Sequence, residues 1–298
     1  MRKKILFIVG GLGTGGTENY LLRFLKYLQG SDYDSYVWCK LGVYGDLKSE
    51  YEKSGVSLIK KKLGYLPSFN YLLLYKFIKK NNFHSVVDFT GNFAAYPLLL
   101  SSIGGVSNRI SFYRTSQNRF NGGFLKHIYN QFLNYIVKKK STKILVNSYA
   151  GVEFFFSDST IKQKKVEVLY NGIDIEAFLS LNEDLREELY IPKEAFVVGH
   201  VGRCNKAKNH KTMLDVANSV CTKSENIYFI FCGHNVTSLS NRVKCEFKDR
   251  IKLLEARKDV IKILNSINCF LFLSTTEGQP NALIEAMAVG RAIVASNI

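Results

Sequence analysis

Two glutamates near the end of the chain have a spacing and a setting that suit a polar ligand. Glu277 follows the apolar run Cys269–Leu273, which has the composition of a buried parallel strand. Glu285 lies in the next predicted helix, because Asn281 is a good N-cap and the residues after it are mostly strong helix formers. Free amides at the helix N-terminus suit a phosphate, and the carboxylates can accept hydrogen bonds from hydroxyl groups. The combination suits a sugar nucleotide, but a solvated helix residue and a loop acid explain the spacing alone equally well.

Two cations follow another predicted strand, in and after the segment Gly199-His-Val-Gly-Arg203. Arg203 and Lys208 at the end of this strand could hold the diphosphate of a sugar nucleotide and stabilise it as a leaving group. The alternative is a solvated basic loop, because Lys206 and Lys211 are close by in the sequence.

A glycine-rich turn follows the first predicted strand, with the spacing Gly11-x-Gly13-x-x-Gly16. This spacing has the form of a dinucleotide fingerprint, but Lys40 stands near the place where an acidic residue would hold a ribose. The turn also lacks the lysine of a phosphate-binding loop of the Walker kind. A nicotinamide-dependent oxidoreductase is therefore supported by this turn alone, and glycines that merely permit a tight turn explain it as well.

Four segments occur in order over nearly the whole chain. They are Gly10–Gly16, Asn171-Gly-Ile-Asp174, Val201-Gly-Arg203 with Lys208-Asn209-His210, and Glu277 to Glu285 with the ending Glu-Ala-Met-Ala. Together they resemble the motifs of retaining glycosyltransferases of family 4 (glycosyl transferases group 1). The resemblance implies an α/β fold of the GT-B type, in which two Rossmann-like, doubly wound domains face a cleft. Residues 1–175 would bind the acceptor, and residues 176–298 would bind the nucleotide sugar.

The resemblance also implies roles for individual residues. Glu277, Arg203 and Lys208 would be catalytic. The donor would contact Gly15, Gly16, Arg203, Lys208, Glu277, Gly278, Asn281, Ala282 and Glu285. Glu285 would hold the ribose, and Glu277 with the backbone after it would hold the transferred sugar. Pro280 departs from the usual motif and has no N–H to donate, which leaves the identity of the sugar open.

The acceptor side departs from the family pattern. Many members carry a histidine after the fifth strand, whereas this chain has Phe112-Tyr-Arg-Thr-Ser-Gln117. We expect Arg109, Arg114 and His127 on the acceptor side, with the leaving phosphate able to act as the base. No cofactor and no metal are expected, because arginine and lysine can neutralise the diphosphate. The acceptor and the linkage stay open.

The net charge of +16 is concentrated in the first half of the chain. Residues 1–180 hold 25 Lys and Arg against 12 Asp and Glu, whereas residues 181–298 hold 16 against 13. A basic domain suits a nucleic acid, an anionic membrane surface or a phosphorylated acceptor. A nucleic-acid-binding protein is suggested by charge alone and leaves Glu277 and Glu285 unexplained, so no nucleic acid is expected. The expected partners are a nucleotide-sugar donor and a lipid-linked or glycan acceptor.

One segment with a basic end could meet a membrane. In residues 124–143, six apolar side chains fall near one stripe, followed by lysines; they are Leu125, Ile128, Tyr129, Phe132, Tyr135 and Ile136. Such a helix can lie on an anionic membrane or cover a sheet, and the periodicity fits both equally. The six cysteines are scattered, and no apolar run reaches the length of a spanning helix. We expect a cytoplasmic protein, with peripheral binding to the inner face of the membrane as an option.

Alternating strand and helix patterns must position all these residues. The predicted strands are Ile5–Val9, Ser35–Cys39, Val56–Ile59, Ser85–Phe89, Arg109–Tyr113 and Lys143–Val146, and then Phe196–Val201, Ile227–Cys232, Ile251–Leu254, Cys269–Leu273 and Ala292–Ala295. Helical patterns lie between most of them, which indicates two doubly wound parallel sheets. An irregular linker is expected at 175–194. Because the chain stops directly after a strand, the second domain is expected to be truncated, as in a fragment.

Overall fold

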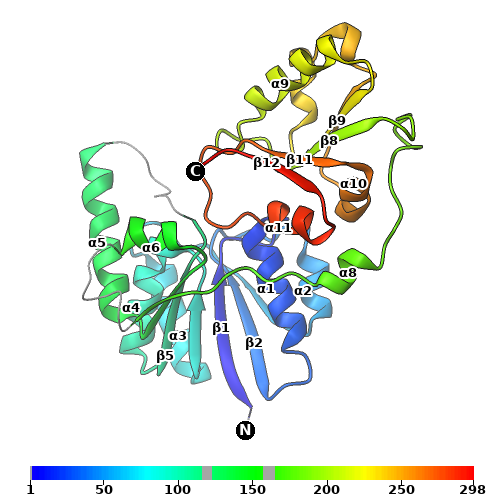
Figure 1. Ribbon diagram of the computed structural model, residues 1–298. Helices are drawn as coiled ribbons and strands as arrows, with labels where there is room; N and C mark the ends of the chain where they lie inside the picture. Colours follow the sequence, from blue (N-terminus) through cyan, green and yellow to red (C-terminus); the bar gives the residue numbers. More distant parts are fainter. Residues whose placement is uncertain (1, 116–122, 157–164) are drawn as a thin grey trace. The chain divides into compact units, whose positions relative to one another are not determined.

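The computed structural model describes residues 2–115, 123–156 and 165–298 (Figure 1). The chain divides into two compact units, Met1–Asn171 and Gly172–Ile298. The expected linker at 175–194 belongs to the second unit: it contains the helix α8 (Ile175–Leu179), and Leu185, Leu189 and Ile191 are buried in the core of that unit. The sequence suggested a linker there because this core segment contains many charged residues and has no regular period.

The first unit is built on a seven-stranded, fully parallel sheet. Its strands are β1 (Lys3–Val9), β2 (Tyr33–Cys39), β3 (Ser57–Lys60), β4 (Ser85–Asp88), β5 (Asn108–Tyr113), β6 (Lys143–Val146) and β7 (Val166–Val168). The order in the sheet is β3-β2-β1-β4-β5-β6-β7. The direction of winding reverses between β1 and β4, and this place is called the switch point of the sheet. A doubly wound sheet binds ligands at the carboxyl ends of the two strands that flank its switch point.

Helices cover both faces of this sheet (Figure 1). They are α1 (Gly16–Tyr27), α2 (Lys48–Lys53), α3 (Phe69–Asn81), η1 (Gly91–Ala94), α4 (Ala95–Ile103), α5 (Phe124–Lys140) and α6 (Tyr149–Phe155). Side chains of α1 and α2 share one core with one face of the sheet, and those of α3, α4, α5 and α6 share the core on the other face. The strand β1 ends in an unbroken buried apolar run from Ile5 to Val9, as a strand covered on both faces should. Between β4 and β5 the chain forms two helices in direct succession, η1 and α4.

The second unit repeats the design with a five-stranded parallel sheet. Its strands are β8 (Phe196–Val201), β9 (Ile227–Cys232), β10 (Ile251–Leu254), β11 (Cys269–Phe272) and β12 (Ala292–Ala295), and the remaining helices are α9 (His210–Lys223), η2 (Thr237–Arg242), η3 (Cys245–Phe247), α10 (Val260–Ser266) and α11 (Asn281–Ala288). The order β10-β9-β8-β11-β12 reverses between β8 and β11. Both units therefore have the predicted Rossmann-like, doubly wound architecture, each with its own switch point.

Within the described residues, no helix is both long and apolar enough to cross a membrane.

Candidate functional site

An ion pair marks the switch point of the second unit. Lys208 lies in the loop after β8 and Glu277 in the loop after β11, and the Lys208 Nζ and Glu277 Oε1 atoms are 2.7 Å apart. The two side chains are only 16% and 19% exposed. Because β8 and β11 are neighbours in the sheet, the fold unites two residues that are far apart in the sequence. The sequence predicted both residues for one site, and the structure brings them together.

Hydrogen bonds hold the two loops in place beneath this pair. The Thr275 amide donates to the Ala207 carbonyl at 2.8 Å, which ties the loop after β11 to the loop after β8. The Lys208 amide donates to Asn205 Oδ1 at 3.0 Å, closing a tight turn before α9. The Lys208 ammonium lies 5.0 Å from the centre of the Phe272 ring. The lysine is thus fixed by its backbone, by an aromatic face and by a carboxylate.

The N-terminus of α11 follows Glu277 and supplies the third part of this site. The helix starts at Asn281, and Pro280 occupies the N-cap, where the sequence suggested Asn281. Proline has no side-chain acceptor, so no N-cap side chain uses the first-turn amides. Of the residues expected to contact the donor, Asn281, Ala282 and Glu285 lie in the first two turns of this helix and Gly278 lies in the loop before it, and all are partly exposed. The positive end of the helix dipole adds to the charge of Lys208.

Arg203 lies in the same β8 loop but differs from Lys208 in its surroundings. Its side chain is exposed, and within the described parts of the chain it forms no ion pair or hydrogen bond. It is therefore free to move toward an anion. The expected diphosphate contact by this residue stays a prediction.

Two buried histidines lie under the β8 loop. His200 is fully buried, its Nδ1 atom is 2.9 Å from the Leu271 carbonyl oxygen, and its ring centre is 5.1 Å from that of His210. Burial lowers the pKa of His200 to about 3 and that of His210 to about 4, with repulsion from the charge of Lys208 adding to both. Both imidazoles are therefore neutral near pH 7. A Cβ on Gly202 would lie 2.7 Å from His200 Nε2, so the loop can pack this closely only as glycine.

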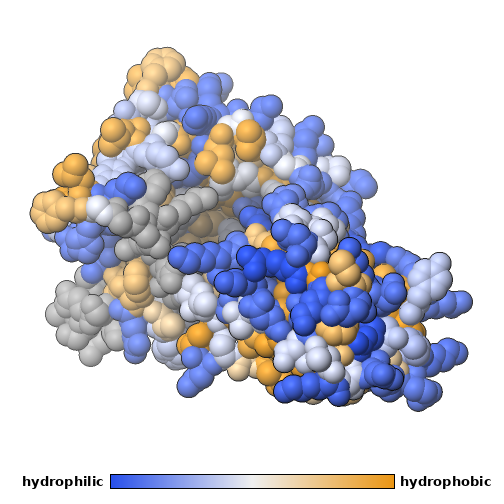
Figure 2. Space-filling view, turned by 90° about the horizontal axis from the view of Figure 1, so that it is seen from above, coloured by the Kyte–Doolittle hydropathy of each residue, from blue (hydrophilic) through white to orange (hydrophobic). Residues whose placement is uncertain are grey.

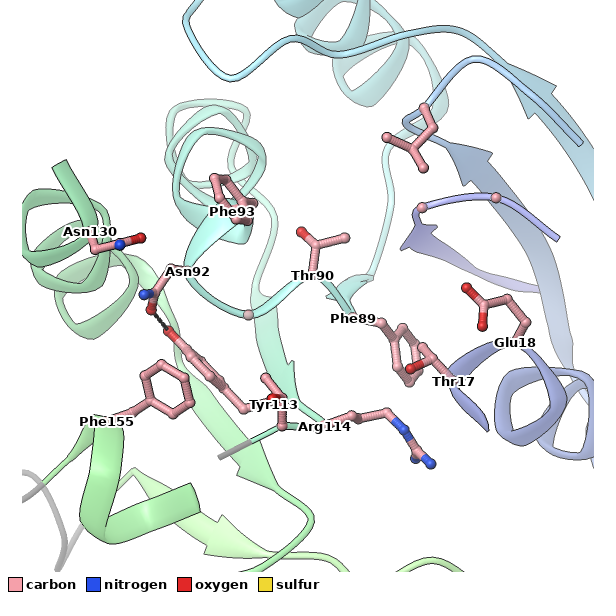
Figure 3. Close-up of a pocket in the computed structure, with 15 residues that line it drawn as sticks. Thr17, Glu18, Phe89, Thr90, Asn92, Phe93, Tyr113, Arg114, Asn130 and Phe155 are labelled. Carbon is pink, nitrogen blue, oxygen red and sulfur yellow. Dashed lines mark hydrogen bonds between the residues drawn. The ribbon is translucent and has the colours of Figure 1, made fainter. Parts of the chain in front are cut away.

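The first unit has a cavity of about 400 Å³ at its own switch point. Figure 3 shows the side chains around it, with Thr17 and Glu18 of α1 on one side and Asn130 of α5 on the other. Its walls include Phe89, Thr90 and Arg114 from the ends of β4 and β5. Gly10 and Gly11 line the cavity after β1. Gly15 and Gly16 do not line it; they are the N-cap and the first residue of α1.

Buried charges shape the turn after β4 that forms one wall of this cavity. Asp88 is fully buried, and its Oδ1 atom accepts hydrogen bonds from the Thr90 amide at 2.8 Å and the Thr90 hydroxyl at 2.6 Å. Lys40 Nζ donates to the Phe93 carbonyl at 2.7 Å and to the Thr90 hydroxyl at 3.2 Å. Burial raises the pKa of Asp88, while the charge of Lys40 opposes that rise. This network fixes the backbone of residues 89–93.

The sequence did not single out Asp88 or assign a site role to Lys40. A polar residue at the carboxyl end of an apolar strand was the available signal for Asp88. Lys40 was noted only as the residue that replaces a ribose-binding acid. Nothing local in the sequence indicates that the two meet, because β1 separates β2 from β4 in the sheet.

Arg114 lies where the sequence placed a contact with the acceptor or a phosphate. Its guanidinium is 4.2 Å from the centre of the Tyr20 ring and 5.3 Å from that of Phe112. The Nε and Nη1 atoms are buried and have no hydrogen-bond partner among the described residues. Burial lowers the pKa of Arg114 to about 10, so it stays charged at neutral pH. A cation with two unused donors beside a cavity is suited to an anionic ligand.

The other two residues expected on the acceptor side lie elsewhere. Arg109 is the second residue of β5 and hence at the amino edge of the sheet, opposite the cavity, where its guanidinium donates to the carbonyls of Val106, Ser107 and Lys140. Arg109 does not line the cavity, and its Nε and Nη1 atoms are used by these carbonyls, so its expected acceptor contact stays a prediction. His127 is exposed in the first turn of α5, does not line the cavity, and lies with its Nε2 atom 2.8 Å from Gln131 Nε2. No group of three or more His, Cys, Asp or Glu side chains that could hold a metal ion occurs in the described residues.

Each of the two units matches a known family of glycosyltransferases. Residues 14–177 match the family model described as Glycosyltransferase Family 4, and residues 182–298 match the model described as Glycosyl transferases group 1. CapH of Staphylococcus aureus, named a capsular polysaccharide biosynthesis glycosyltransferase, is 28% identical over 307 residues, which cover 99% of this chain and 81% of CapH.

Two further proteins add to this comparison. A Campylobacter jejuni enzyme named N-acetylgalactosamine-N,N'-diacetylbacillosaminyl-diphospho-undecaprenol 4-alpha-N-acetylgalactosaminyltransferase is 28% identical over 184 residues, or 61% of this chain and 47% of that protein. Among solved structures, HepE of Anabaena in complex with UDP-glucose superimposes with a TM-score of 0.77 at 18% identity, covering 98% of this chain and 80% of HepE.

Proposed function

Because the chain belongs to glycosyltransferase family 4, we propose that it moves a sugar from a nucleotide-sugar donor to a lipid-linked or polysaccharide acceptor, with retention of the anomeric configuration. That it is a glycosyltransferase with the GT-B fold is the premise, and the donor, the acceptor and the stereochemistry are the proposal. The observation that supports it best is the Lys208–Glu277 pair beside the N-terminus of α11.

On the donor side, the second unit would bind the diphosphate. Lys208 and Arg203 supply positive charge, and α11 adds the positive end of its dipole. Glu277 would accept a hydrogen bond from the transferred sugar while keeping Lys208 in position, and Glu285 would accept hydrogen bonds from the ribose hydroxyls. When the bond from the sugar to the diphosphate breaks, the new negative charge on the leaving oxygen is stabilised by these cations. The proposal requires no metal ion.

On the acceptor side, the cavity of the first unit would bind the acceptor, and Arg114 would contact an anionic group on it. In a retaining front-face step, the acceptor hydroxyl attacks the anomeric carbon on the face that the diphosphate leaves. The leaving phosphate oxygen takes the hydroxyl proton, so no side chain needs to act as the base.

The printed names of the relatives support a role in the synthesis of cell-surface glycans. CapH is named for capsular polysaccharide biosynthesis, and the name of the Campylobacter jejuni enzyme contains a diphospho-undecaprenol acceptor. HepE was crystallised with UDP-glucose, which supports a nucleotide-sugar donor here. We place this reaction on the cytoplasmic side, at the inner face of the membrane.

The test is product analysis with a panel of UDP- and GDP-sugars and a diphospho-undecaprenol glycan as acceptor. We expect one donor to give a glycosylated lipid, with the anomeric configuration of the donor kept in the product by NMR. Calorimetry with UDP, GDP, NADH and duplex DNA at two salt concentrations accompanies it. Binding of NADH or DNA without binding of UDP or GDP would contradict the proposal.

A further inference from the structure

Helix α5 has two apolar faces, and among the described residues only one of them packs into the core. Leu133 and Val137 are fully buried in the core over the sheet, and Tyr129 and Ile136 pack at its edge. A second stripe is exposed; it consists of Phe124 (77% exposed), Leu125 (80%), Ile128 (45%), Phe132 (50%) and Tyr135 (57%). A helix that only covers a sheet needs one apolar face. The periodicity of the sequence fits a membrane helix and a sheet-covering helix equally, and in the structure one stripe is buried in the core while the other is exposed.

A second segment extends this exposed apolar surface. Its members are Tyr65 (53% exposed), Leu66 (65%), Phe69 (71%) and Leu72 (46%), in the loop before α3 and in its first turn. The two segments are linked by a hydrogen bond from the Tyr129 hydroxyl to the Tyr65 carbonyl. Helices α3 and α5 each follow a parallel strand, so both begin at the carboxyl edge of the sheet, where the cavity lies. We call these nine exposed residues the apolar rim.

The apolar rim borders the cavity of the first unit. The ring of Tyr65 lies 5.4 Å from the ring of Phe93, centre to centre, and Phe93 lines the cavity. Asn130, which follows the first turn of α5, also lines the cavity, on the same side as Phe93 (Figure 3). In Figure 2, hydrophobic side chains stand out at the side of the first unit where Figure 1 draws α5. A surface that adheres to lipid here would bring the mouth of the cavity to the lipid headgroups.

Lysines follow the apolar stripe on both helices. On α5 they are Lys138 and Lys139, and the Lys139 ammonium lies 5.5 Å from the centre of the Tyr135 ring. On α3 the exposed lysines Lys76 and Lys80 continue the face that begins with Phe69. Apolar and aromatic side chains beside lysines are typical of surfaces that enter the boundary layer of an anionic bilayer. An anionic bilayer is a partner whose charge complements these lysines.

We infer that the apolar rim docks on an anionic lipid bilayer and that the cavity of the first unit takes its acceptor from that bilayer. The uptake of the acceptor from the bilayer rests on the proposed lipid-linked acceptor, whereas the docking of the apolar rim does not. The rim side chains enter the layer between headgroups and acyl chains, and the lysines reach the lipid phosphates.

The docking half is tested by sedimentation with vesicles of phosphatidylcholine, with and without phosphatidylglycerol. The double variant Phe124→Ser/Leu125→Ser should bind the anionic vesicles at least about tenfold more weakly, because two apolar side chains no longer enter the lipid. Tyr27→Ser/Leu179→Ser removes two other strongly exposed apolar side chains (83% and 60% exposed) and should bind like the parent. Equal loss in both double variants, or in neither, would overturn the proposed surface.

The charge is tested with Lys138→Gln/Lys139→Gln against the control Lys223→Gln/Lys248→Gln, whose lysines are exposed on the second unit. Each lysine near an anionic surface should contribute about fivefold to binding, and the effect should fade as salt rises. Strong binding to pure phosphatidylcholine, insensitive to these changes, would contradict an anionic partner. Sedimentation without lipid tests the alternative: a dimer that Phe124→Ser/Leu125→Ser dissociates would assign the rim to a second copy.

The acceptor half is tested by turnover with vesicle-embedded acceptor and with a short-chain, water-soluble acceptor. Phe124→Ser/Leu125→Ser should slow only the first reaction, while UDP or GDP binding by calorimetry stays unchanged. An equal loss with both acceptors would contradict delivery from the bilayer. If no donor gives product with either acceptor, the proposed function fails, and the vesicle experiments still decide the docking surface.

Discussion

The two switch points occupy the same place in two similar sheets but are built from different chemistry. In the first unit, the ionic groups Lys40 and Asp88 are buried and committed to fixed hydrogen bonds behind a cavity with aromatic walls. In the second, Arg203 is exposed and the Lys208–Glu277 pair is partly exposed. Lys40 and Asp88 are thus locked into the scaffold, whereas Arg203, Lys208 and Glu277 are accessible to a ligand. The fold determines where a ligand binds, and the environment of each charge determines whether it can respond.

The difference has an energetic basis. A buried charge retains its ionised form only with good hydrogen bonds and a partner, so removing one member leaves the other uncompensated. A half-exposed pair loses less when it opens, because water replaces the missing contact. We therefore expect substitutions of Lys40 or Asp88 to alter the stability of the first unit. Substitutions of Lys208 or Arg203 should instead alter ligand binding by the second unit.

The largest expected effect is on the buried charges of the first unit. Lys40→Met leaves the Asp88 carboxylate buried without its cation and should destabilise that unit by roughly 3–5 kcal/mol. Hydrogen exchange followed by mass spectrometry, read separately for the peptides of each unit, measures it. Lys48→Met is the matched control, because the Lys48–Glu52 pair is exposed and should be worth less than about 1 kcal/mol. A loss for Lys40→Met as small as that of the control would remove the distinction between the two switch points.

Acid should destabilise the second unit more than the first. The pKa values of His200 and His210 are lowered in the folded chain, so the unfolded chain binds more protons below pH 6.5, and stability falls with pH from there toward pH 4. Between pH 6.5 and 5 each histidine should lower the stability of the second unit by about 2 kcal/mol. Burial raises the pKa of Asp88, so the buried carboxylate lowers the stability of the first unit once the pH exceeds about 3.8, the pKa of this group in the unfolded chain. In more acid solution this loss of stability is smaller.

Hydrogen exchange at pH 6.5 and pH 5, corrected for the intrinsic exchange rates, checks this contrast. Peptides of β8 and α9 should lose protection on acidification, and peptides of β4 should lose less. Equal losses in both units would show that the buried histidines do not control the response of the second unit.

Much of the second site could be predicted from the sequence because its motifs are local. A strand, a turn and a helix that follow each other between Cys269 and Ala288 place Glu277 and Glu285 without knowledge of the sheet. The network of Lys40 and Asp88 depends on strand order, since β1 lies between the strands that carry them. Periodicity could not divide α5 between core and exposed stripes, because both stripes are apolar. The sequence also contained a signal for the position of Arg109. Arg109 begins the predicted strand, and a residue at the start of β5 lies at the amino edge of the sheet, away from the cavity at the carboxyl edge.

The next largest effect is expected on nucleotide binding by the second unit. Lys208→Ala should weaken binding of the donor nucleotide diphosphate about tenfold or more, because a charge-assisted contact is worth roughly 1.5–3 kcal/mol. The Lys208→Ala variant should lose far less folding stability than the Lys40→Met variant, because the Lys208–Glu277 pair is partly exposed. Calorimetry with UDP and GDP measures the affinity, and Lys206→Ala in the same loop is the control. A large loss of stability with unchanged affinity would make Lys208 a structural residue like Lys40.

The smallest effect is expected for Arg203. Its side chain is exposed, so its attraction to a diphosphate is screened by water and salt, and Arg203→Ala should weaken nucleotide binding by only about threefold to tenfold. The loss should shrink as salt rises from low ionic strength, whereas the loss for Lys208→Ala should change less, because that ammonium is only partly exposed. Calorimetry of both variants at two salt concentrations separates the two cations. If Arg203→Ala instead gave the larger and less salt-dependent loss, Arg203 would become buried against the bound diphosphate, and the exposed cation of the free enzyme would be its principal phosphate contact.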